Sequence, residues 1–408
     1  MVVKAITVKT ISQAVDARFE EQVGFLRQLV RAKSVNPYIA SESPINEAIE
    51  GRVAEVLFAK LEELGLAPQY RGINKIRQNV VAEWGDRRAR RTLMLNGHMD
   101  TIPVDEKRAK DPFSGRVRDG KLYGVGAADM KATLSAYIFA VAALRDLGVE
   151  ICGRVILAFV VDEESGASSR YGTQYLLEEG FLPKACLIGE PGTEYVRIGH
   201  RGLYRFRLIV YGESVHTGVG AWERGERGHN AVVDMAKAIE ALQNLEIPFK
   251  QSKTFPDRKP VFTFPTKVEG GVAMNAVPSK AEAYGDVRLL PGNSDTQVKL
   301  LIVERLHKLG IRYDLQDLLF VPAVEIDSRE EVVTGLLLAI KEVEGRDAEV
   351  RGAGPGNDAH FLIKRDIPTV CGYGPDGGGE HGASEWVDLA SLKLVTKVYA
   401  KYILNMVG

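Results

Sequence analysis

The chain has 408 residues, a length that predicts two domains because one hydrophobic core rarely serves more than about 250–300 residues. A hydrophobic content of 45% and a charged content of 26% are typical of a soluble globular protein. The formal net charge of -1 gives no electrostatic reason to expect a nucleic acid or an anionic membrane as a partner.

The N-terminus and the cysteines indicate a cytoplasmic protein. The first ten residues contain no apolar signal-peptide core, and no apolar stretch of the sequence has the length of a membrane span. Cys152, Cys186 and Cys371 are odd in number, lack CxxC spacing and lie in or beside apolar runs. We therefore expect buried free thiols in a reducing compartment.

Apolar residues at helical spacing predict two helices near the start of the chain, over 17–34 and 47–65. Two strands are expected next, over 79–84 and 92–95. The basic cluster 87–91 lies between these strands, and its composition indicates a solvated hairpin tip.

The second of these strands leads into Asn96-Gly97-His98-Met99-Asp100. His98 and Asp100 are two residues apart, so in an extended chain their side chains lie on the same side. This spacing suits a metal-ligating histidine and a carboxylate that orients its ring, although such pairs also cap turns.

A glycine-rich loop over 119–126 precedes Ala127-Ala128-Asp129-Met130-Lys131 and a long helix that ends near Leu147. The loop is not a dinucleotide-binding fingerprint, because no GxGxxG motif is formed. A metal-binding carboxylate fits Asp129 better than a dinucleotide motif does, and the alternative is a helix N-cap, which is the more common role of an aspartate at a helix start.

An apolar run over 154–161 ends in Asp162-Glu163-Glu164. This pattern predicts a buried parallel strand whose carboxyl end carries the chemistry, as in open α/β sheets. Clustered like charges are unfavourable unless cations or protons offset them, so a metal is the simplest explanation, although acidic triplets usually stand at solvated loop ends.

A helix over 171–180 and a buried run over 185–188 follow, and the run ends in Gly189-Glu190-Pro191. Metal-ligand side chains thus stand at three strand ends and one helix start: His98, Glu164, Glu190 and Asp129. We expect these four side chains to meet in one metal site.

The pattern then changes to β-α-β-β-α-β, which predicts a compact ferredoxin-like domain. Its elements are expected at 203–211, 230–245, 261–268, 281–290, 295–309 and 311–320. The α/β pattern resumes afterwards with a helix over 329–345, a strand over 369–373, a glycine-rich loop that contains His381, and a helix over 389–406. We therefore expect an α/β domain with a mostly parallel sheet, 1–202 and 319–408, interrupted by an α+β domain, 203–318.

These motifs resemble those of the M20 metallohydrolases, which include acetylornithine deacetylase, succinyl-diaminopimelate desuccinylase, aminoacylase and the glutamate carboxypeptidases. The resemblance covers essentially the whole chain and rests on five motifs in order: 97–100, 124–131, 162–164, 189–191, and His381 before Glu385. It implies a zinc-peptidase-like catalytic domain and an inserted domain that serves as lid and dimerisation surface.

The resemblance also implies two divalent metal ions that share one carboxylate: His98, Asp129 and Glu190 for the first, Asp129, Glu164 and His381 for the second. Glu163 would be the general base, and Asp100 would orient His98. In the family the peptide bond after the bridging aspartate is cis, here Asp129-Met130. Imidazole and carboxylate ligands favour Zn2+, while Co2+ or Mn2+ would suit the same set.

The inserted domain carries the family's substrate-binding motifs at His216, Asn275 and Arg288. In relatives these residues bind the substrate carboxylate and the scissile carbonyl, and the histidine reaches the partner subunit's active site. The resemblance therefore implies a homodimer formed through 203–318, with His216 acting in trans. The alternatives are a surface histidine on a monomer and a strand arginine that faces solvent.

Three positions depart from the family pattern. Val125 replaces an arginine, Ala132 replaces a glycine, and His360 stands where several deacylases carry an arginine. The first hypothesis is a metal-dependent hydrolase of linear amide bonds that removes an acyl group from an N-acyl amino acid, of the acetylornithine or succinyl-diaminopimelate type. The alternatives are a metallo-carboxypeptidase or dipeptidase, whose substrate is a short peptide, and a non-catalytic binding homologue.

Overall fold

The computed structural model describes residues 6–36, 49–73, 75, 77–104, 111–165 and 169–408. The expected helix start at 47–48 and Gly166 of the acidic motif lie outside these ranges. The chain forms two compact units, and each is described by itself. The larger comprises Met1–Gly199, Glu325–Ala353 and Asn357–Gly408, and the smaller comprises His200–Val324 and Gly354–Gly356. The insertion had been expected over 203–318.

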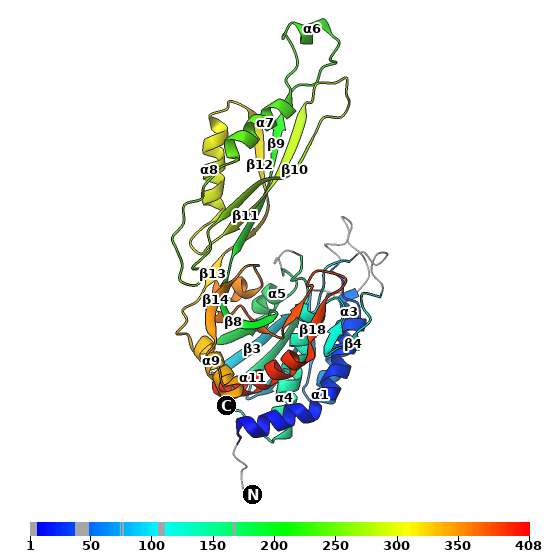
Figure 1. The fold of residues 1–408 in the computed structure, drawn as a ribbon, viewed down its shortest axis with the longest axis vertical. Coiled ribbons are helices and arrows are strands. Elements are labelled where there is room, and N and C mark those ends of the chain that lie inside the picture. Colours follow the sequence, from blue (N-terminus) through cyan, green and yellow to red (C-terminus); the bar gives the residue numbers. More distant parts are fainter. Residues whose placement is uncertain (1–5, 37–48, 74, 76, 105–110, 166–168) are drawn as a thin grey trace. The chain divides into compact units, whose positions relative to one another are not determined.

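The larger unit is built on a six-stranded sheet with the order β1-β2-β6-β3-β7-β15 (Figure 1). Its strands are β1 (Gln69–Arg71), β2 (Asn79–Gly85), β6 (Arg154–Val160), β3 (Thr92–His98), β7 (Ala185–Ile188) and β15 (Thr369–Val370). The strands β6, β3, β7 and β15 run parallel, while β2 is antiparallel to β6 and β1 to β2. The predicted α/β fold with a mostly parallel sheet is confirmed.

Both faces of this sheet are buried, as its apolar strands require. In β6, Val155, Leu157 and Phe159 join one core cluster, and the alternating Ile156 and Ala158 join the other. The first cluster includes residues of α1 (Val8–Arg31), α3 (Ile49–Glu63), α4 (Ala132–Asp146), α9 (Glu331–Glu344) and α11 (Leu389–Val407). The second includes residues of α5 (Thr173–Glu178) and α10 (Ala359–Ile363).

Two four-stranded sheets complete this part of the fold. One contains β13 (Val324–Glu325), β8 (Gly192–His200), β14 (Glu349–Ala353) and β16 (Gly372–Gly374). The other contains β17 (Gly377–Gly378), β18 (Trp386–Asp388), β5 (Lys121–Tyr123) and β4 (Arg116–Arg118). The sequence analysis did not predict these sheets, because most of their strands are short and their partners are distant in the chain.

The helical stretch Ala127–Asp146 is, by length and composition, apolar enough to cross a membrane, with a mean hydropathy of 1.3. The expectation that no apolar stretch reaches that length is therefore wrong. However, 94% of the most apolar window is buried inside the protein, which identifies it as a core helix.

The smaller unit has the predicted β-α-β-β-α-β order: β9 (Gly202–Tyr211), α7 (Ala231–Leu242), β10 (Val261–Gly270), β11 (Lys280–Leu289), α8 (Asp295–His307) and β12 (Arg312–Val321). A short helix, α6 (Gly220–Glu223), lies between β9 and α7. The antiparallel sheet has the order β10-β11-β9-β12. Tyr204, Phe206 and Leu208 of β9 belong to its core. The alternating Arg205 and Arg207 form ion pairs on the other face.

Three local expectations are wrong. The helix predicted to begin at 17 begins at Val8, where Thr7 and Thr10 form a capping box. The cluster 87–91 is not a hairpin tip, because β6 lies between β2 and β3 in the sheet. Cys152 is exposed, whereas Cys186 and Cys371 are buried free thiols.

Candidate metal centre

The strand order brings the expected ligands to one edge of the sheet. His98 is the last residue of β3, Glu164 follows β6, and Glu190 follows β7. Because β3 lies between β6 and β7 and all three are parallel, their carboxyl ends meet at the same edge.

Asp129 reaches this edge from a tight turn before α4. Gly126 has φ +79, and a Cβ there would lie 2.6 Å from Thr101 Cγ2, so only glycine fits. The turn η1 (Ala127–Lys131) has non-helical backbone angles at Asp129 and Met130. The Asp129-Met130 peptide bond is cis, which confirms the prediction from the family resemblance.

The two carboxylate oxygens of Asp129 face two different histidines. His98 Nε2 is 2.9 Å from Asp129 Oδ1, and His381 Nε2 is 3.3 Å from Asp129 Oδ2. His381 Nε2 is also 3.3 Å from Glu164 Oε2. Such separations suit a metal site, since donor atoms around one zinc ion lie about 3.4 Å apart.

His98, Asp129 and Glu164 form a possible metal-binding group, in which each offers a ligand atom within 4.8 Å of the others. Glu190 interacts electrostatically with these three side chains. Burial, and then the negative charge of Asp129, raise the pKa of Glu190 to about 8. The donor set of imidazoles and carboxylates fits divalent zinc-like metals.

The centre strongly attracts positive charge. Hydrogen bonds to Asp129 and Glu164 raise the pKa of His381 to about 10. Burial by itself would raise the pKa of Asp129, but its hydrogen bonds to His381 and His98 lower it below the usual value. The negative charge that raises the pKa of His381 would equally favour a metal cation among the same side chains.

The backbone carbonyl of Asp100 orients the ring of His98, whereas the carboxylate of Asp100 had been expected to do so. The ring Nδ1 lies 2.9 Å from the backbone carbonyl oxygen of Asp100 and 3.7 Å from the carboxylate Oδ1. A carbonyl oxygen only accepts hydrogen bonds, so Nδ1 carries a proton, and in the neutral ring Nε2 keeps a lone pair for a metal. The carboxylate of Asp100 instead accepts the backbone N–H groups of Glu163 and Glu164.

Asp162, the first residue of the acidic triplet after β6, belongs to a separate ion-pair network. Asp162 has φ +74 and turns away from the ligands, where its Oδ1 accepts a hydrogen bond from buried Arg77 at 3.1 Å. Arg77 also forms two hydrogen bonds with Glu50, at 2.7 and 2.8 Å. The sequence analysis missed this ion-pair network, since its three members are far apart in the chain and match no motif.

Glu385 was noticed only as part of a motif, and its contacts are backbone contacts. Its carboxylate accepts the N–H groups of Gly126, Ala128 and Asp129 at 2.8–2.9 Å. Burial raises the pKa of Glu385 to about 7.

In the smaller unit, His216 and Asn275 lie together, with Nε2 and Nδ2 separated by 3.4 Å. Arg288 lies at the other end of the sheet, because it pairs with Leu203 while Lys280 pairs with Tyr211. Eight strand residues separate these two ends by about 26 Å. The structure therefore does not bring the three expected substrate-binding residues of one chain together.

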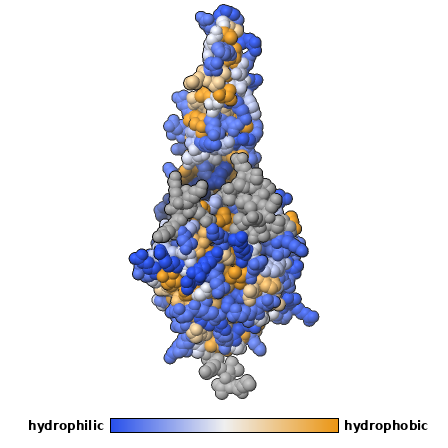
Figure 2. Space-filling view, turned by 90° about the vertical axis from the view of Figure 1, so that its right-hand side faces the viewer, coloured by the Kyte–Doolittle hydropathy of each residue, from blue (hydrophilic) through white to orange (hydrophobic). Residues whose placement is uncertain are grey.

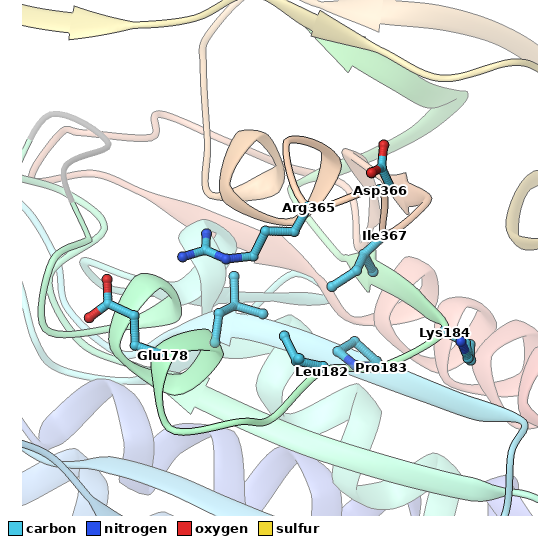
Figure 3. Close-up of a pocket in the computed structure, with 8 residues that line it drawn as sticks. Glu178, Leu182, Pro183, Lys184, Arg365, Asp366 and Ile367 are labelled. Atoms are coloured by element: carbon cyan, nitrogen blue, oxygen red, sulfur yellow. The ribbon is translucent and has the colours of Figure 1, made fainter.

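A surface hollow of the larger unit is remote from the candidate ligands. Its lining includes Pro183 and Lys184, which precede β7, and Ile367, which precedes β15. It therefore lies at the amino ends of the parallel strands, opposite the edge that carries His98. Figure 3 shows that Arg365 extends toward Glu178, while Lys184 lies on the far side of the hollow.

Comparison with known proteins gives one family. The model for peptidase family M20/M25/M40 matches residues 94–405. A succinyl-diaminopimelate desuccinylase of Dinoroseobacter shibae is 28% identical over 401 residues, covering 94% of this chain and 98% of the relative. An acetylornithine deacetylase of Photorhabdus laumondii is 28% identical over 398 residues, covering 93% of this chain and 96% of the relative.

Among solved structures, an M20 family metallo-carboxypeptidase of Sulfolobus solfataricus has the same fold. It superposes with a TM-score of 0.74 at 20% identity and covers 95% of this chain and 99% of its own. The chain belongs to peptidase family M20/M25/M40, and it is a hydrolase that acts on amide bonds.

Proposed function

We propose that the protein is a two-metal amidohydrolase that removes an acyl group from an N-acyl amino acid, of the acetylornithine deacetylase or succinyl-diaminopimelate desuccinylase type. The observation that carries this proposal is the position of Asp129 between His98 and His381, with one carboxylate oxygen toward each ring. The names of the two curated relatives support the substrate class.

The side chains present would hold one Zn2+ with His98, Asp129 and Glu190 and a second with Asp129, Glu164 and His381. Co2+ or Mn2+ would suit the same donors. When bound, two such ions polarise an amide carbonyl and lower the pKa of water toward neutrality.

We propose Glu163 as the general base. It adjoins Glu164, and its backbone N–H lies 3.3 Å from Asp100 Oδ1. Burial raises the pKa of Glu163 well above its usual value. A base with a raised pKa can take a proton from water and then pass it to the departing amine.

A group of arginines favours a substrate that carries a carboxylate. The carboxylate of Asp286 is shared by two arginines, because it accepts hydrogen bonds from both Arg288 and Arg205. Burial, Arg258 and Arg288 lower the pKa of Arg201, whose Nε has no hydrogen-bond partner among the described residues. Guanidinium groups in such surroundings suit carboxylate recognition.

The smaller unit supports a homodimer formed through 203–318. His216 Nδ1 accepts the N–H of Gly218 at 3.0 Å, which leaves Nε2, the ring nitrogen beside Asn275, as the atom that would donate to an oxyanion when it carries the proton. Beside Asn275, the apolar side chains of Val272 and Met274 are 95% and 104% exposed. Figure 2 also shows apolar residues at the surface of this unit. We propose that His216 and Asn275 serve the partner's metal centre.

A metallo-carboxypeptidase or dipeptidase is the second candidate. It is retained because His360 stands at a position where several deacylases carry an arginine that helps to recognise the substrate. This histidine is buried, and its Nδ1 lies 2.8 Å from the backbone oxygen of Asn357.

The test is hydrolysis of matched N-acetyl, N-succinyl and dipeptide substrates by metal-stripped protein to which Zn2+ or Co2+ is returned. We expect no activity after chelation, recovery with metal, and preference for an N-acyl amino acid. Full activity without metal would overturn the two-metal proposal, and exclusive dipeptide cleavage would favour the second candidate.

A further inference from the structure

The carboxylate of Glu385 is a buried acceptor for the turn that carries Asp129. Its side chain is almost inaccessible, with the residue 1% exposed. Oε2 accepts the N–H of Gly126 at 2.8 Å, and Oε1 accepts those of Ala128 and Asp129 at 2.8 and 2.9 Å. The turn is non-helical at Asp129, so these N–H groups need acceptors from elsewhere.

The backbone of Glu385 belongs to the loop that carries His381. Its N–H donates to the carbonyl of Gly382 at 3.3 Å, and the N–H of Gly382 donates to Gly379 at 3.0 Å. His381 lies within this closed loop and has φ +60. The carbonyl of Glu385 also accepts the N–H of Gly124, just before the Asp129 turn, at 2.9 Å.

One residue therefore ties together two segments that are more than 250 positions apart in the chain. Their side chains meet where His381 Nε2 lies 3.3 Å from Asp129 Oδ2. An error of one ångström in this separation would spoil a shared coordination site, because metal–ligand distances vary by only about 0.2 Å.

We propose that Glu385 is a positioning residue that sets the separation of Asp129 and His381 and thereby the affinity for the second metal ion. This inference rests on the proposed two-metal centre. The positioning role requires the side-chain length and the two acceptor oxygens of Glu385, in addition to its charge.

Two variants separate position from charge. Glu385→Gln keeps the size but presents an amide N–H to the turn, where three N–H groups already point. Glu385→Asp keeps the charge but shortens the side chain by one carbon–carbon bond, about 1.5 Å. Glu380→Gln is the matched control, since it removes an exposed carboxylate next to His381 without touching the turn.

The experiment titrates Co2+ into the metal-stripped full chain and follows binding by calorimetry and by the visible absorption of Co2+. We expect wild type and Glu380→Gln to bind two equivalents. For both Glu385 variants we expect the second equivalent to bind about 10–100-fold more weakly, with an altered Co2+ spectrum. Thermal unfolding of the metal-free proteins shows whether each variant is folded; if Glu385→Asp is not, Glu385→Gln decides.

Wild-type affinity for both equivalents in Glu385→Gln would overturn the proposal, even if its melting temperature were lower. Wild-type affinity in folded Glu385→Asp would overturn it as well, because charge alone would then suffice. If wild type itself bound no Co2+, the two-metal centre would fail, and the inference about Glu385 with it.

Discussion

The carboxylate of Asp100 accepts the backbone N–H of Glu164 at 3.0 Å. The same carboxylate accepts the side-chain amide of Asn36 at 2.7 Å, while the backbone carbonyl of Asp100 contacts His98. Asp100 thus links the end of β3 to the turn after β6, and its hydrogen bonds fix the positions of the proposed ligand Glu164 and the proposed base Glu163 relative to His98.

Asp100→Asn should weaken these hydrogen bonds, because an amide has one acceptor oxygen where the carboxylate has two. Loss of such a supporting contact lowers metal affinity by about 10–100-fold. The affinity for Zn2+ can be measured by competition with a chromophoric chelator. An unchanged affinity together with unchanged turnover would show that the backbone carbonyl alone supports the site.

Glu163→Gln should separate metal binding from chemistry. The amide cannot take a proton from water, so turnover should fall by about 10²–10⁴-fold, while metal content and KM change little. Glu164→Gln is the matched comparison at the adjacent position, and it should lose metal. Loss of metal in Glu163→Gln would instead make Glu163 a ligand.

Arg77→Met should destabilise the larger unit, because it leaves the buried carboxylates of Glu50 and Asp162 without their shared cation. Breaking a buried ion pair in this way costs about 3–5 kcal/mol. Urea unfolding of the metal-free protein measures this loss. Arg118→Met, which removes an exposed partner of Asp119, should change the free energy of unfolding by less than about 1 kcal/mol.

Lys131→Met should alter the pH dependence of stability. Burial lowers the pKa of Lys131 to about 7, and its Nζ donates to the carbonyl of Ala32 at 3.2 Å. Between pH 7 and the ordinary lysine pKa, the folded protein binds fewer protons at this residue than the unfolded chain. The free energy of unfolding therefore rises with pH in this window, by up to about 1.4 kcal/mol per pKa unit.

The variant lacks this titration, so the stability of wild type relative to Lys131→Met should increase from pH 7 to pH 10. Urea unfolding of both metal-free proteins at each pH gives the difference. A constant difference across the range would show that the lysine pKa is not lowered.

Mixing two inactive proteins tests whether His216 acts in trans. His216→Ala lacks the oxyanion donor, and removal of one such donor typically costs about 10²–10³-fold in turnover. In a heterodimer of His216→Ala with Glu163→Gln, one metal centre keeps its base and receives an intact histidine from the partner. Partial recovery of activity is expected after subunit exchange. No recovery despite demonstrated exchange would place His216 in cis or outside the mechanism.

Much of the site was predictable because the chemistry lies where regular elements end. The apolar runs before His98, Glu164 and Glu190 are continuous, and such runs predict parallel strands whose carboxyl ends meet. The alternation in β9 likewise predicted a half-exposed strand of the smaller unit. These inferences need only local periodicity and the general geometry of sheets.

Only the tertiary structure decided which neighbour each polar group would face. The sequence by itself determined the residue types, the order of the elements and the motifs of the family. It could not show that Asp162 turns to Arg77, that the carboxylate of Asp100 accepts backbone N–H groups, or that Glu385 joins two distant segments. The physical reason is that a hydrogen bond depends on distances within about 3.5 Å, and chain periodicity does not specify such distances between remote segments.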